Sequence, residues 1–457
     1  MLRVFRHYVP GLAVLVIAAD AAVLLAAVAI PYMLGGWIGD GALWPKAITL
    51  CGVTVFALYL ADLHRTDLRL GGREVTGRLL VALVASAVVL AAAGFAVPAL
   101  RFGRLAFVQI FAIASAGLLV WRLAWDRVRS HDRLRPRVLV LGVSRAADAL
   151  AELQATGSQP FTILGFLDDD PAAFERLPAG SALLGKSKDL LNLVEELEPD
   201  VVLVALPDMR GALPTADLLE CRLRGIRVED WPTFYEKQTG KVSVTDLRPS
   251  WLIFSDGFVK GQPSRTAKRA LDLVLAAAGL VLASPVMALV ALAIKLDSPG
   301  PVLFRQERVG QNGRIFVLNK FRSMRADAER ESGPVWAVPG DPRVTRVGRF
   351  LRRTRLDELP QLFNVLVGHM SFVGPRPERP DFVRLLQRQI PFYTGRLAVR
   401  PGITGWAQVR YRYAGSVADQ REKLQYDLYY VKNLSPFLDL LILLHTVQVV
   451  LFARGAR

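Results

Sequence analysis

The chain has 457 residues, and its 57 Lys and Arg residues outnumber its 41 Asp and Glu residues, so the formal net charge is +16. Hydrophobic residues make up 52% of the chain, charged residues make up 21%, and the mean hydropathy is +0.31. These values argue against an intrinsically disordered chain and against a purely soluble enzyme. Two cysteines are too few for a disulfide framework, and the five histidines lie too far apart in the sequence for a zinc site.

The first 126 residues predict a block of four transmembrane helices. Arginines precede the block, lie at its middle and follow it, so the positive-inside rule places both of its ends in the cytoplasm. A cleaved signal peptide is the alternative for the first apolar stretch, but three more stretches follow it and no convincing cleavage site does. Asp20 marks either a hydrogen bond between helices or a polar pathway, and we favour the hydrogen bond. The four stretches, each close to the ~20 residues that a helix needs to cross a bilayer, lie at roughly 12–33, 43–61, 79–100 and 105–121.

Residues 136–255 alternate between short apolar runs and helical segments, which predicts a Rossmann-like domain with a parallel sheet. A dinucleotide site in such a domain needs a G-x-G-x-x-G loop, so that the backbone can approach a pyrophosphate. The loop after the first predicted strand keeps one of these three glycines, Gly142. We therefore expect a regulatory or structural domain, and whether it binds a ligand stays open.

An apolar segment at 273–294 is long enough to cross a membrane, but Ser284 and Pro285 interrupt it at its middle. Proline lacks a backbone donor and kinks a helix. Basic residues flank the segment on both sides, which disfavours crossing. We predict a re-entrant membrane hairpin at 271–296, made of two helices that dip into the inner leaflet and return, with its break at Ser284 and Pro285.

Beyond this segment the sequence becomes dense in polar motifs. Lys320 and Arg322 are one strand period apart, so we expect both on one face of a strand, where they can meet phosphates. Pro375 and Pro377 flank Arg376, which predicts a rigid loop that orients the guanidinium.

Two adjacent carboxylates, Asp357 and Glu358, follow a run of arginines that includes Arg352, Arg353 and Arg355. Neighbouring residues on a helix point about 100° apart, so these acids are not a facing acid and base pair. We expect one to be a nucleophile and the other a metal or proton partner. The arginines should keep Asp357 ionised and bind a diphosphate, and attack of a carboxylate on phosphorus gives an acyl phosphate. A helix cap with arginines at the membrane surface is the alternative for this segment alone.

Together these motifs, over residues 264–457, closely resemble the bacterial sugar transferase family, the monotopic phosphoglycosyl transferases. With the preceding parts the whole chain resembles the large family members that initiate exopolysaccharide or O-antigen synthesis, in which a CoA-binding-like domain precedes the transferase. The stretch at 411–430 is most similar to the exopolysaccharide branch linked to PEP-CTERM sorting systems. It departs from the V-N-G-R version of the preceding loop, since it has Val409, Arg410 and Tyr411.

The resemblance implies roles for individual residues. Asp357 falls on the covalent nucleophile, Glu358 on the residue that assists with the required Mg²⁺, and both on the metal site. Arg352 falls on a phosphate-binding arginine, and Ser284 and Pro285 fall on the break of the hairpin. The full set of substrate-binding residues that we predict is Lys320, Arg322, Arg352, Arg353, Arg355, Pro375, Arg376 and Pro377.

The fold class predicted is membrane α plus α/β, in three parts at 1–126, 136–255 and 264–457. The expected reaction moves a hexose 1-phosphate from a UDP-sugar to undecaprenyl phosphate through Asp357 and releases UMP, on the cytoplasmic face of the bacterial inner membrane. The rivals are a glycosyltransferase that releases UDP and a non-catalytic membrane scaffold that senses nucleotides. The basic charge is assigned to membrane lipids and phosphorylated substrates, not to nucleic acid, and the resemblance implies a homodimer. The donor sugar is not specified by any residue.

Overall fold

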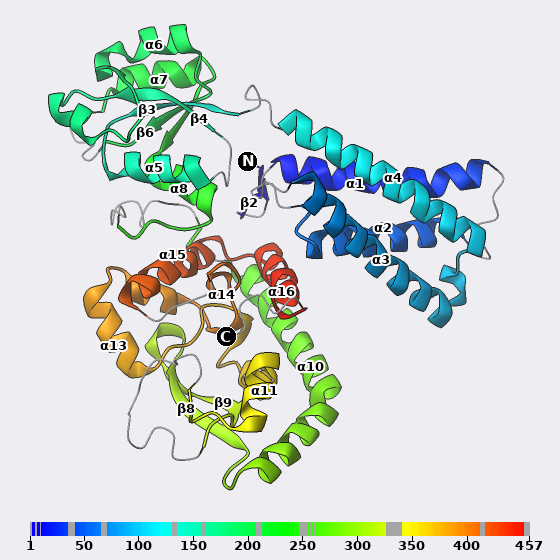
Figure 1. Ribbon diagram of the computed structural model, residues 1–457. Helices are drawn as coiled ribbons and strands as arrows, with labels where there is room; N and C mark the ends of the chain where they lie inside the picture. The colour runs from blue at the N-terminus through cyan, green and yellow to red at the C-terminus, as the bar shows by residue number, and fades with distance from the viewer. Residues whose placement is uncertain are drawn as a thin grey trace. The chain divides into compact units, whose positions relative to one another are not determined.

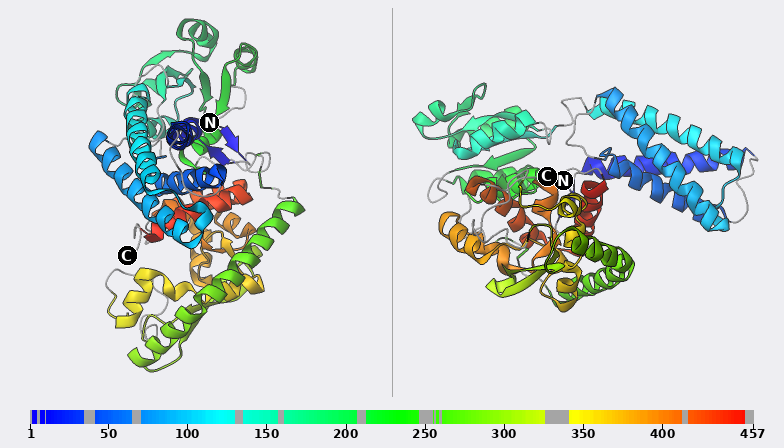
Figure 2. Two further views of the ribbon diagram at one scale, coloured as in Figure 1. Left: turned by 90° about the vertical axis from the view of Figure 1, so that its right-hand side faces the viewer. Right: turned by 60° about the horizontal axis from the view of Figure 1, so that its bottom comes forward.

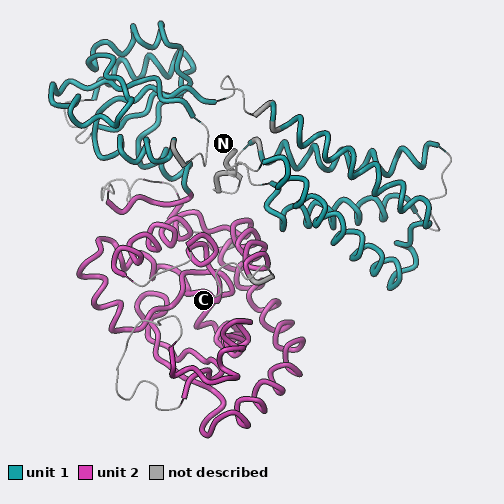
Figure 3. Tube along the Cα trace, in the orientation of Figure 1, with its two compact units in different colours: residues 1–2, 8–239 teal, residues 3–7, 240–457 magenta. Residues whose placement is uncertain are grey.

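The chain divides into two compact units, residues 1–2 with 8–239 and residues 3–7 with 240–457 (Figure 3). The structure is a computed structural model. It describes residues 2–4, 7–9, 11–34, 42–64, 71–129, 135–156, 161–206, 213–245, 255, 257–258, 261–325, 341–411 and 416–451. Near the N-terminus the short strands β1 (Leu2–Val4) and β2 (His7–Val9) pair with each other.

Four long apolar helices confirm the predicted membrane block (Figures 1 and 2). Each is long and apolar enough to cross a membrane. Helix α1 packs on α2 and α4, and α3 packs on the same two helices. Small and aliphatic side chains fill the inside of the bundle, while large aliphatic side chains on the outside stay exposed, as a lipid-facing surface requires. The helices are α1 (Gly11–Met33), α2 (Leu43–Leu60), α3 (Gly72–Ala96) and α4 (Arg104–Arg129), with a 3₁₀ turn η1 (Pro98–Leu100) before α4.

Asp20 confirms the expected bond between helices. Its carboxylate is fully buried and accepts a hydrogen bond from the guanidinium of Arg122 on α4. The Nε2 atom of His64 lies 2.8 Å from the same carboxylate oxygen, and Arg122 also donates to the carbonyl of Leu63. The buried charge is therefore paired, and the pair holds the turn after α2 against α1 and α4.

The middle domain has the predicted parallel sheet, with strand order β5-β4-β3-β6-β7. Apolar cores cover both faces of the sheet, which is why its central strands β3 and β6 read as aliphatic runs. Its strands are β3 (Arg137–Leu141), β4 (Thr162–Leu167), β5 (Leu183–Gly185), β6 (Val201–Val204) and β7 (Arg227–Asp230). Its helices are α5 (Arg145–Thr156), α6 (Leu190–Leu197), α7 (Thr215–Leu223) and α8 (Trp231–Thr239), with 3₁₀ turns η3 (Pro171–Arg176) and η4 (Ser187–Asp189).

The loop between β3 and α5 uses its backbone donors within the protein. Gly142 has a φ of 101°, and a Cβ there would lie 2.8 Å from the backbone of Leu206. The fold itself therefore requires glycine at this position, whether or not a ligand binds. The N–H of Val143 donates to Asp168, at 2.6 Å, and the N–H of Ala146 donates to the hydroxyl of Ser144. A dinucleotide-binding domain directs the N–H groups of this loop at a pyrophosphate. Because Val143 and Ala146 use theirs within the protein, the geometry supports a structural or regulatory role.

The second unit contains the transferase-like motifs. A β-hairpin joins β8 (Leu303–Val309) to β9 (Ile315–Phe321) through the 3₁₀ turn η5 (Gln311–Gly313), and the short strands β10 (Ser371–Val373) and β11 (Gly402–Thr404) pair in parallel. The helices are α10 (Gln262–Asp297), α11 (Arg346–Thr354), α12 (Gln361–Val367), α13 (Pro380–Gln389), α14 (Trp406–Arg410), α15 (Val417–Asn433) and α16 (Pro436–Leu451), with 3₁₀ turns η6 (Leu356–Glu358) and η7 (Tyr393–Ala398).

This unit starts earlier than the predicted boundaries of 255 and 264. Val242 and Val244 are buried in its largest apolar cluster. The N–H of Val242 donates to the carbonyl of Gln425, and the indole of Trp406 donates to the carbonyl of Gly240, at 2.9 Å. The segment at 240–245 therefore folds with the second unit and not with the Rossmann-like domain, which ends at α8.

Helix α10 differs from the predicted pair of helices. It remains one α-helix through Ser284 and Pro285, with a bend part-way along it (Figure 1). Pro285 lacks the N–H that would bond to the carbonyl of Val281, and the hydroxyl of Ser284 donates to that carbonyl instead, at 2.8 Å. Because the serine replaces the missing donor, the apolar helix can bend at this point without unwinding.

Both ends of α10 are held by the second unit, along one side of which the helix runs (Figure 2). Near its N-terminus, Asp272 accepts hydrogen bonds from the hydroxyl of Ser371 and the N–H of Phe372, both at 2.9 Å. At its C-terminus, Asp297 accepts from the N–H of Val347 at the start of α11. A helix that simply crossed a bilayer would carry its two ends to opposite faces, whereas these ends meet the same compact unit.

Candidate active site

The two predicted carboxylates lie in a tight turn between α11 and α12. Helix α11 ends at Thr354, and Arg355 adopts a left-handed conformation with a φ of 62°. This residue turns the chain into η6, which carries Asp357 and Glu358 and leaves them 7% and 9% exposed. Pro360 then precedes α12. The turn buries both acids in one place, and their partners differ.

Glu358 is surrounded by cations. Its Oε1 atom lies 3.0 Å from the ammonium of Lys320 on β9 and 3.1 Å from a guanidinium nitrogen of Arg376, and Arg355 approaches it at 3.8 Å. Burial alone would raise the pKa of Glu358, but Lys320, Arg376 and Arg355 together hold the pKa of this carboxyl far below its usual range. Glu358 in turn raises the pKa of Arg376. Glu358 is therefore the ionised, compensated member of the pair.

Asp357 has the opposite electrostatics. Burial raises the pKa of Asp357 and outweighs the opposing effect of Lys320, with Glu358 raising it further. Arg376 and Arg355 do oppose this shift, as the sequence suggested, but their effect is smaller than that of burial, because the cations nearest to the pair bind Glu358. The Oδ1 atom of Asp357 is buried and has no hydrogen-bond partner among the residues that the structure describes. A carboxylate oxygen in this state is suited to bind an incoming electrophile or cation.

The arginines of α11 divide between the site and the surface. Arg352 is half-buried in the last turn of the helix, where its charge helps to lower the pKa of Asp341, which the adjacent Arg343 holds at about 2. Arg353 is exposed, and Arg355 contacts Glu358 only at the long distance given above. The structure thus brings Arg355, Lys320 and Arg376 to the acidic pair.

Arg322 has a different position from the one predicted. Its side chain is 5% exposed, and its terminal nitrogens donate to the carbonyls of Pro299 and Ser298 and to the hydroxyl of Ser298, at 2.7–3.0 Å. The residue therefore fixes the turn after α10, and we assign it this structural role in place of a phosphate contact.

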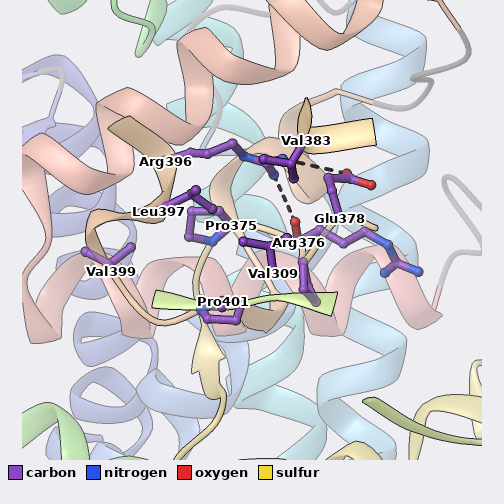
Figure 4. Close-up of a pocket in the computed structure, with 11 residues that line it drawn as sticks. Val309, Pro375, Arg376, Glu378, Val383, Arg396, Leu397, Val399 and Pro401 are labelled. Carbon is purple, nitrogen blue, oxygen red and sulfur yellow. Dashed lines mark hydrogen bonds and ion pairs between the residues drawn. The ribbon is translucent and has the colours of Figure 1, made fainter. Parts of the chain in front are cut away.

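The loop with Pro375, Arg376 and Pro377 lies between β10 and α13. Gly374 begins the loop, and a Cβ on this glycine would lie 2.3 Å from the carbonyl oxygen of Arg400. The chain at 400–405 therefore packs directly against the loop backbone. All three loop residues line a pocket, whose other walls come from β8, α13 and the segment at 396–401 (Figure 4). The pocket is mostly apolar apart from its charged residues, Arg376, Glu378 and Arg396.

A buried set of charges that the sequence did not predict lies behind this loop. Arg396, Asp427 and Lys423 are 3%, 1% and 8% exposed, and they meet Glu378 or one another. Lys423 donates to Glu378, whose pKa of about 2 reflects Lys423 and then Arg396 overcoming the effect of burial. The four-residue spacing of Lys423 and Asp427 on one helix was the only signal for this set.

Comparison with known proteins matches two family models. The model described as bacterial sugar transferase matches residues 263–453, and the model described as a CoA-binding domain matches residues 61–212, which takes in α3 and α4 as well as most of the parallel sheet. The exopolysaccharide production protein PSS of Rhizobium leguminosarum bv. phaseoli is 47% identical over 185 residues, which cover 92% of that protein and 39% of this chain. The chain belongs to the bacterial sugar transferase family.

Two relatives in this family match a longer part of the chain. UDP-N-acetylgalactosamine-undecaprenyl-phosphate N-acetylgalactosaminephosphotransferase of Aeromonas hydrophila is 46% identical over 241 residues, 52% of this chain and 56% of that protein. Undecaprenyl-phosphate glucose phosphotransferase of Komagataeibacter xylinus is 36% identical over 332 residues, 71% of this chain and 60% of that protein. The chain thus spans less than two thirds of the length of both relatives, whose names specify different sugars.

Proposed function

We propose that this sugar transferase moves a hexose 1-phosphate from a UDP-sugar to undecaprenyl phosphate, through a covalent intermediate on Asp357. The observation that carries the proposal is the difference between the adjacent acids: Glu358 is compensated by Lys320 and Arg376, while Asp357 keeps a buried oxygen that no described residue partners. A nucleophile needs a lone pair that no hydrogen-bond donor engages, and a negatively charged donor needs fixed cations nearby. The two relatives are named as undecaprenyl-phosphate phosphotransferases, one for N-acetylgalactosamine and one for glucose. These names support the same class of reaction.

The steps follow from these roles. A carboxylate oxygen of Asp357 attacks the β-phosphorus of the donor, the bond from that phosphorus to the bridging oxygen breaks, and UMP leaves with the bonding electrons. A phosphate oxygen of undecaprenyl phosphate then attacks the phosphorus of the acyl phosphate, and cleavage of the bond to Asp357 regenerates the carboxylate. Lys320, Arg355 and Arg376 hold positive charge beside the reacting phosphates, with Glu358 fixing the position of two of them.

A magnesium ion fits this arrangement through Asp357. Mg²⁺ is usually bound by one or two carboxylates together with substrate phosphates and water, and it neutralises charge on a diphosphate. Among the described residues no three His, Cys, Asp or Glu side chains gather into a ligand set. The Oδ1 atom of Asp357, which has no partner in the described part of the chain, would be the protein ligand, and Glu358 would join it only by releasing one of its cations.

The membrane topology that we propose rests on α10. A re-entrant helix, bent part-way along its length and held at both ends by one unit, would keep the site at the depth of the lipid headgroups, where a lipid phosphate and a nucleotide can meet. The charge bias of the first block supports the further proposal that the catalytic unit lies on the cytoplasmic face of the inner membrane. Exopolysaccharide synthesis is the process that the name of the Rhizobium relative favours, and a homodimer is proposed from the resemblance alone.

The released nucleotide tests the reaction class. Membranes that contain the full chain should release UMP from UDP-glucose or UDP-N-acetylgalactosamine when undecaprenyl phosphate is added, as measured by chromatography of the soluble fraction. Release of UDP would identify a glycosyltransferase and overturn the proposal. Nucleotide binding without turnover of any UDP-sugar would favour the non-catalytic scaffold.

Thiol labelling tests the topology. In a variant in which Cys51 and Cys221 are replaced by Ser, Gly300→Cys should react with an impermeant maleimide only after the cells are opened. Ala42→Cys, at the start of α2 in the loop predicted to be external, should react in intact cells and serves as the matched control. Labelling of Gly300→Cys from outside would show that α10 crosses the membrane.

A further inference from the structure

Arg396 lies at the centre of the buried charges behind the Pro-Arg-Pro loop. Its side chain, 3% exposed, extends from η7 (Figure 4). One terminal nitrogen donates to the hydroxyl of Tyr393, at 2.9 Å, and lies 3.8 Å from Glu378. The other lies 2.8 Å from Asp427 and donates to the backbone carbonyl of Arg376, at 2.9 Å. One guanidinium thus joins the loop to η7 and α15.

The surrounding charges leave this guanidinium little freedom to move. Glu378 and Asp427 face it from two sides, and Lys423 supplies a second cation to Glu378. Removing one partner of a buried ion pair leaves the other charge uncompensated, which strongly destabilises the folded state. Each member of this set therefore holds the others in place. Burial also raises the pKa of Tyr393 to about 12, so its hydroxyl stays neutral across the physiological range.

The bond to the loop constrains the direction of Arg376. The carbonyl that Arg396 holds belongs to the middle residue of Pro375-Arg376-Pro377, and the prolines on either side restrict the backbone of the loop. The side chain of Arg376 leaves this fixed backbone and reaches Glu358 at 3.1 Å. An error of about 1 Å in the backbone would be passed to the guanidinium at the reacting phosphates, where such errors can cost about 100-fold in rate.

We propose that Arg396 is a positioning residue, which orients Arg376 toward the donor diphosphate by holding the carbonyl of Arg376 against η7 and α15. This inference rests on the proposed function, because the donor is the molecule that Arg376 is taken to bind. Arg396 does not itself contact the acidic pair, and its effect on the reaction passes through Arg376.

Arg396→Lys tests the proposal, since lysine keeps the charge facing Glu378 and Asp427 but cannot make the forked contacts. We expect kcat/KM for the UDP-sugar to fall about 10- to 100-fold, mainly through a higher KM for the donor, with the KM for undecaprenyl phosphate unchanged. General destabilisation would reduce the active fraction of the protein without raising the KM for the donor selectively over the KM for undecaprenyl phosphate. Arg384→Lys, an exposed change on α13 that also faces a carboxylate, is the matched control and should behave as the wild type.

A double-mutant cycle decides whether the effect passes through Arg376. The double variant Arg376→Ala with Arg396→Lys should lose no more activity than Arg376→Ala alone. The proposal would be overturned if the two substitutions lowered activity independently, so that their fold-losses multiplied in the double variant, or if Arg396→Lys had wild-type kinetics. If Arg396→Lys does not fold, Tyr393→Phe removes one partner of Arg396 without changing the shape of the core, and it should show the same rise in donor KM to a smaller degree.

The two proposals can fail separately. Equilibrium binding of the UDP-sugar to the purified full chain needs no turnover, and Arg396→Lys should weaken it by the same factor as the donor KM. If the wild type binds the donor but releases UDP, the reaction class is wrong, and a weakened Arg396→Lys still supports the positioning role. Unchanged donor affinity in a folded Arg396→Lys protein overturns the positioning role whatever nucleotide is released.

Discussion

Asp357→Asn is expected to abolish UMP release while leaving the protein folded and at least as heat-stable as the wild type. Asparagine has nearly the same shape but is a far weaker nucleophile, so no acyl phosphate can form. Incubation with a sugar-labelled UDP-sugar in the absence of undecaprenyl phosphate should leave a phosphosugar adduct on the wild-type protein alone, detected by intact-protein mass spectrometry. UMP release at the wild-type rate by this variant would show that Asp357 is not the nucleophile.

The stability of this variant follows from the direction of the pKa shift. Burial raises the pKa of Asp357 in the folded state above 3.8, so folding favours the protonated form. The folded state is therefore destabilised as the pH rises from 3.8 through the folded pKa, and the ionised carboxylate remains a cost at neutral pH. Asparagine removes that cost. The thermal midpoint of Asp357→Asn in detergent should equal or exceed that of the wild type at pH 7, while Asp381→Asn, an exposed change on α13, should leave it unchanged.

Local patterns were sufficient for much of the fold. The four apolar helices and the alternation of strands and helices in the middle domain depend on periodicities within short windows, and the structure has both. The different surroundings of Asp357 and Glu358 also follow from a local fact, because adjacent residues in a helical turn point in different directions. Arg322 shows where such a rule ends. Strand β9 stops at Phe321, so the two-residue period that paired Arg322 with Lys320 no longer applies to it.

Effects that depend on tertiary burial were beyond the sequence. Arginines close to Asp357 in the chain suggested a lowered pKa, but the cations that decide the charge balance, Lys320 and Arg376, approach from other segments and bind Glu358 instead. Arg396 and Asp427 are 31 residues apart and meet only after η7 packs on α15. The hydroxyl of Ser284 shows the same limit on a smaller scale: the proline predicts a disrupted helix, and the serine bond that keeps it continuous appears only in the structure.

Glu358→Gln is expected to destabilise the catalytic unit strongly, in contrast to the change at its neighbour. Glutamine keeps an acceptor but removes the charge that Lys320 and Arg376 share, so two cations are left close together in a mostly buried site. Breaking a buried ion pair by removing one partner typically costs ~3–5 kcal/mol, and because the Arg376 side chain is 35% exposed to screening water we expect about 2–4 kcal/mol. Because glutamine at this position would no longer hold either cation in place, the variant should also lose UMP release.

The pH dependence of stability separates this electrostatic effect from a packing defect. Lys320, Arg376 and Arg355 overcome the effect of burial and lower the folded pKa of Glu358 below its ordinary value of 4.5. Its stabilising contribution is therefore fully present above pH 4.5 and is lost as the pH falls through the folded pKa. Denaturation of the wild type and of Glu358→Gln should differ most at neutral pH and converge in acid, whereas Glu307→Gln, an exposed change on β8, should follow the wild type throughout. A gap between Glu358→Gln and the wild type that stays constant down to low pH would mean that the carboxylate supports the site by its shape and hydrogen bonds, and not by the charge that holds Lys320 and Arg376 beside Asp357.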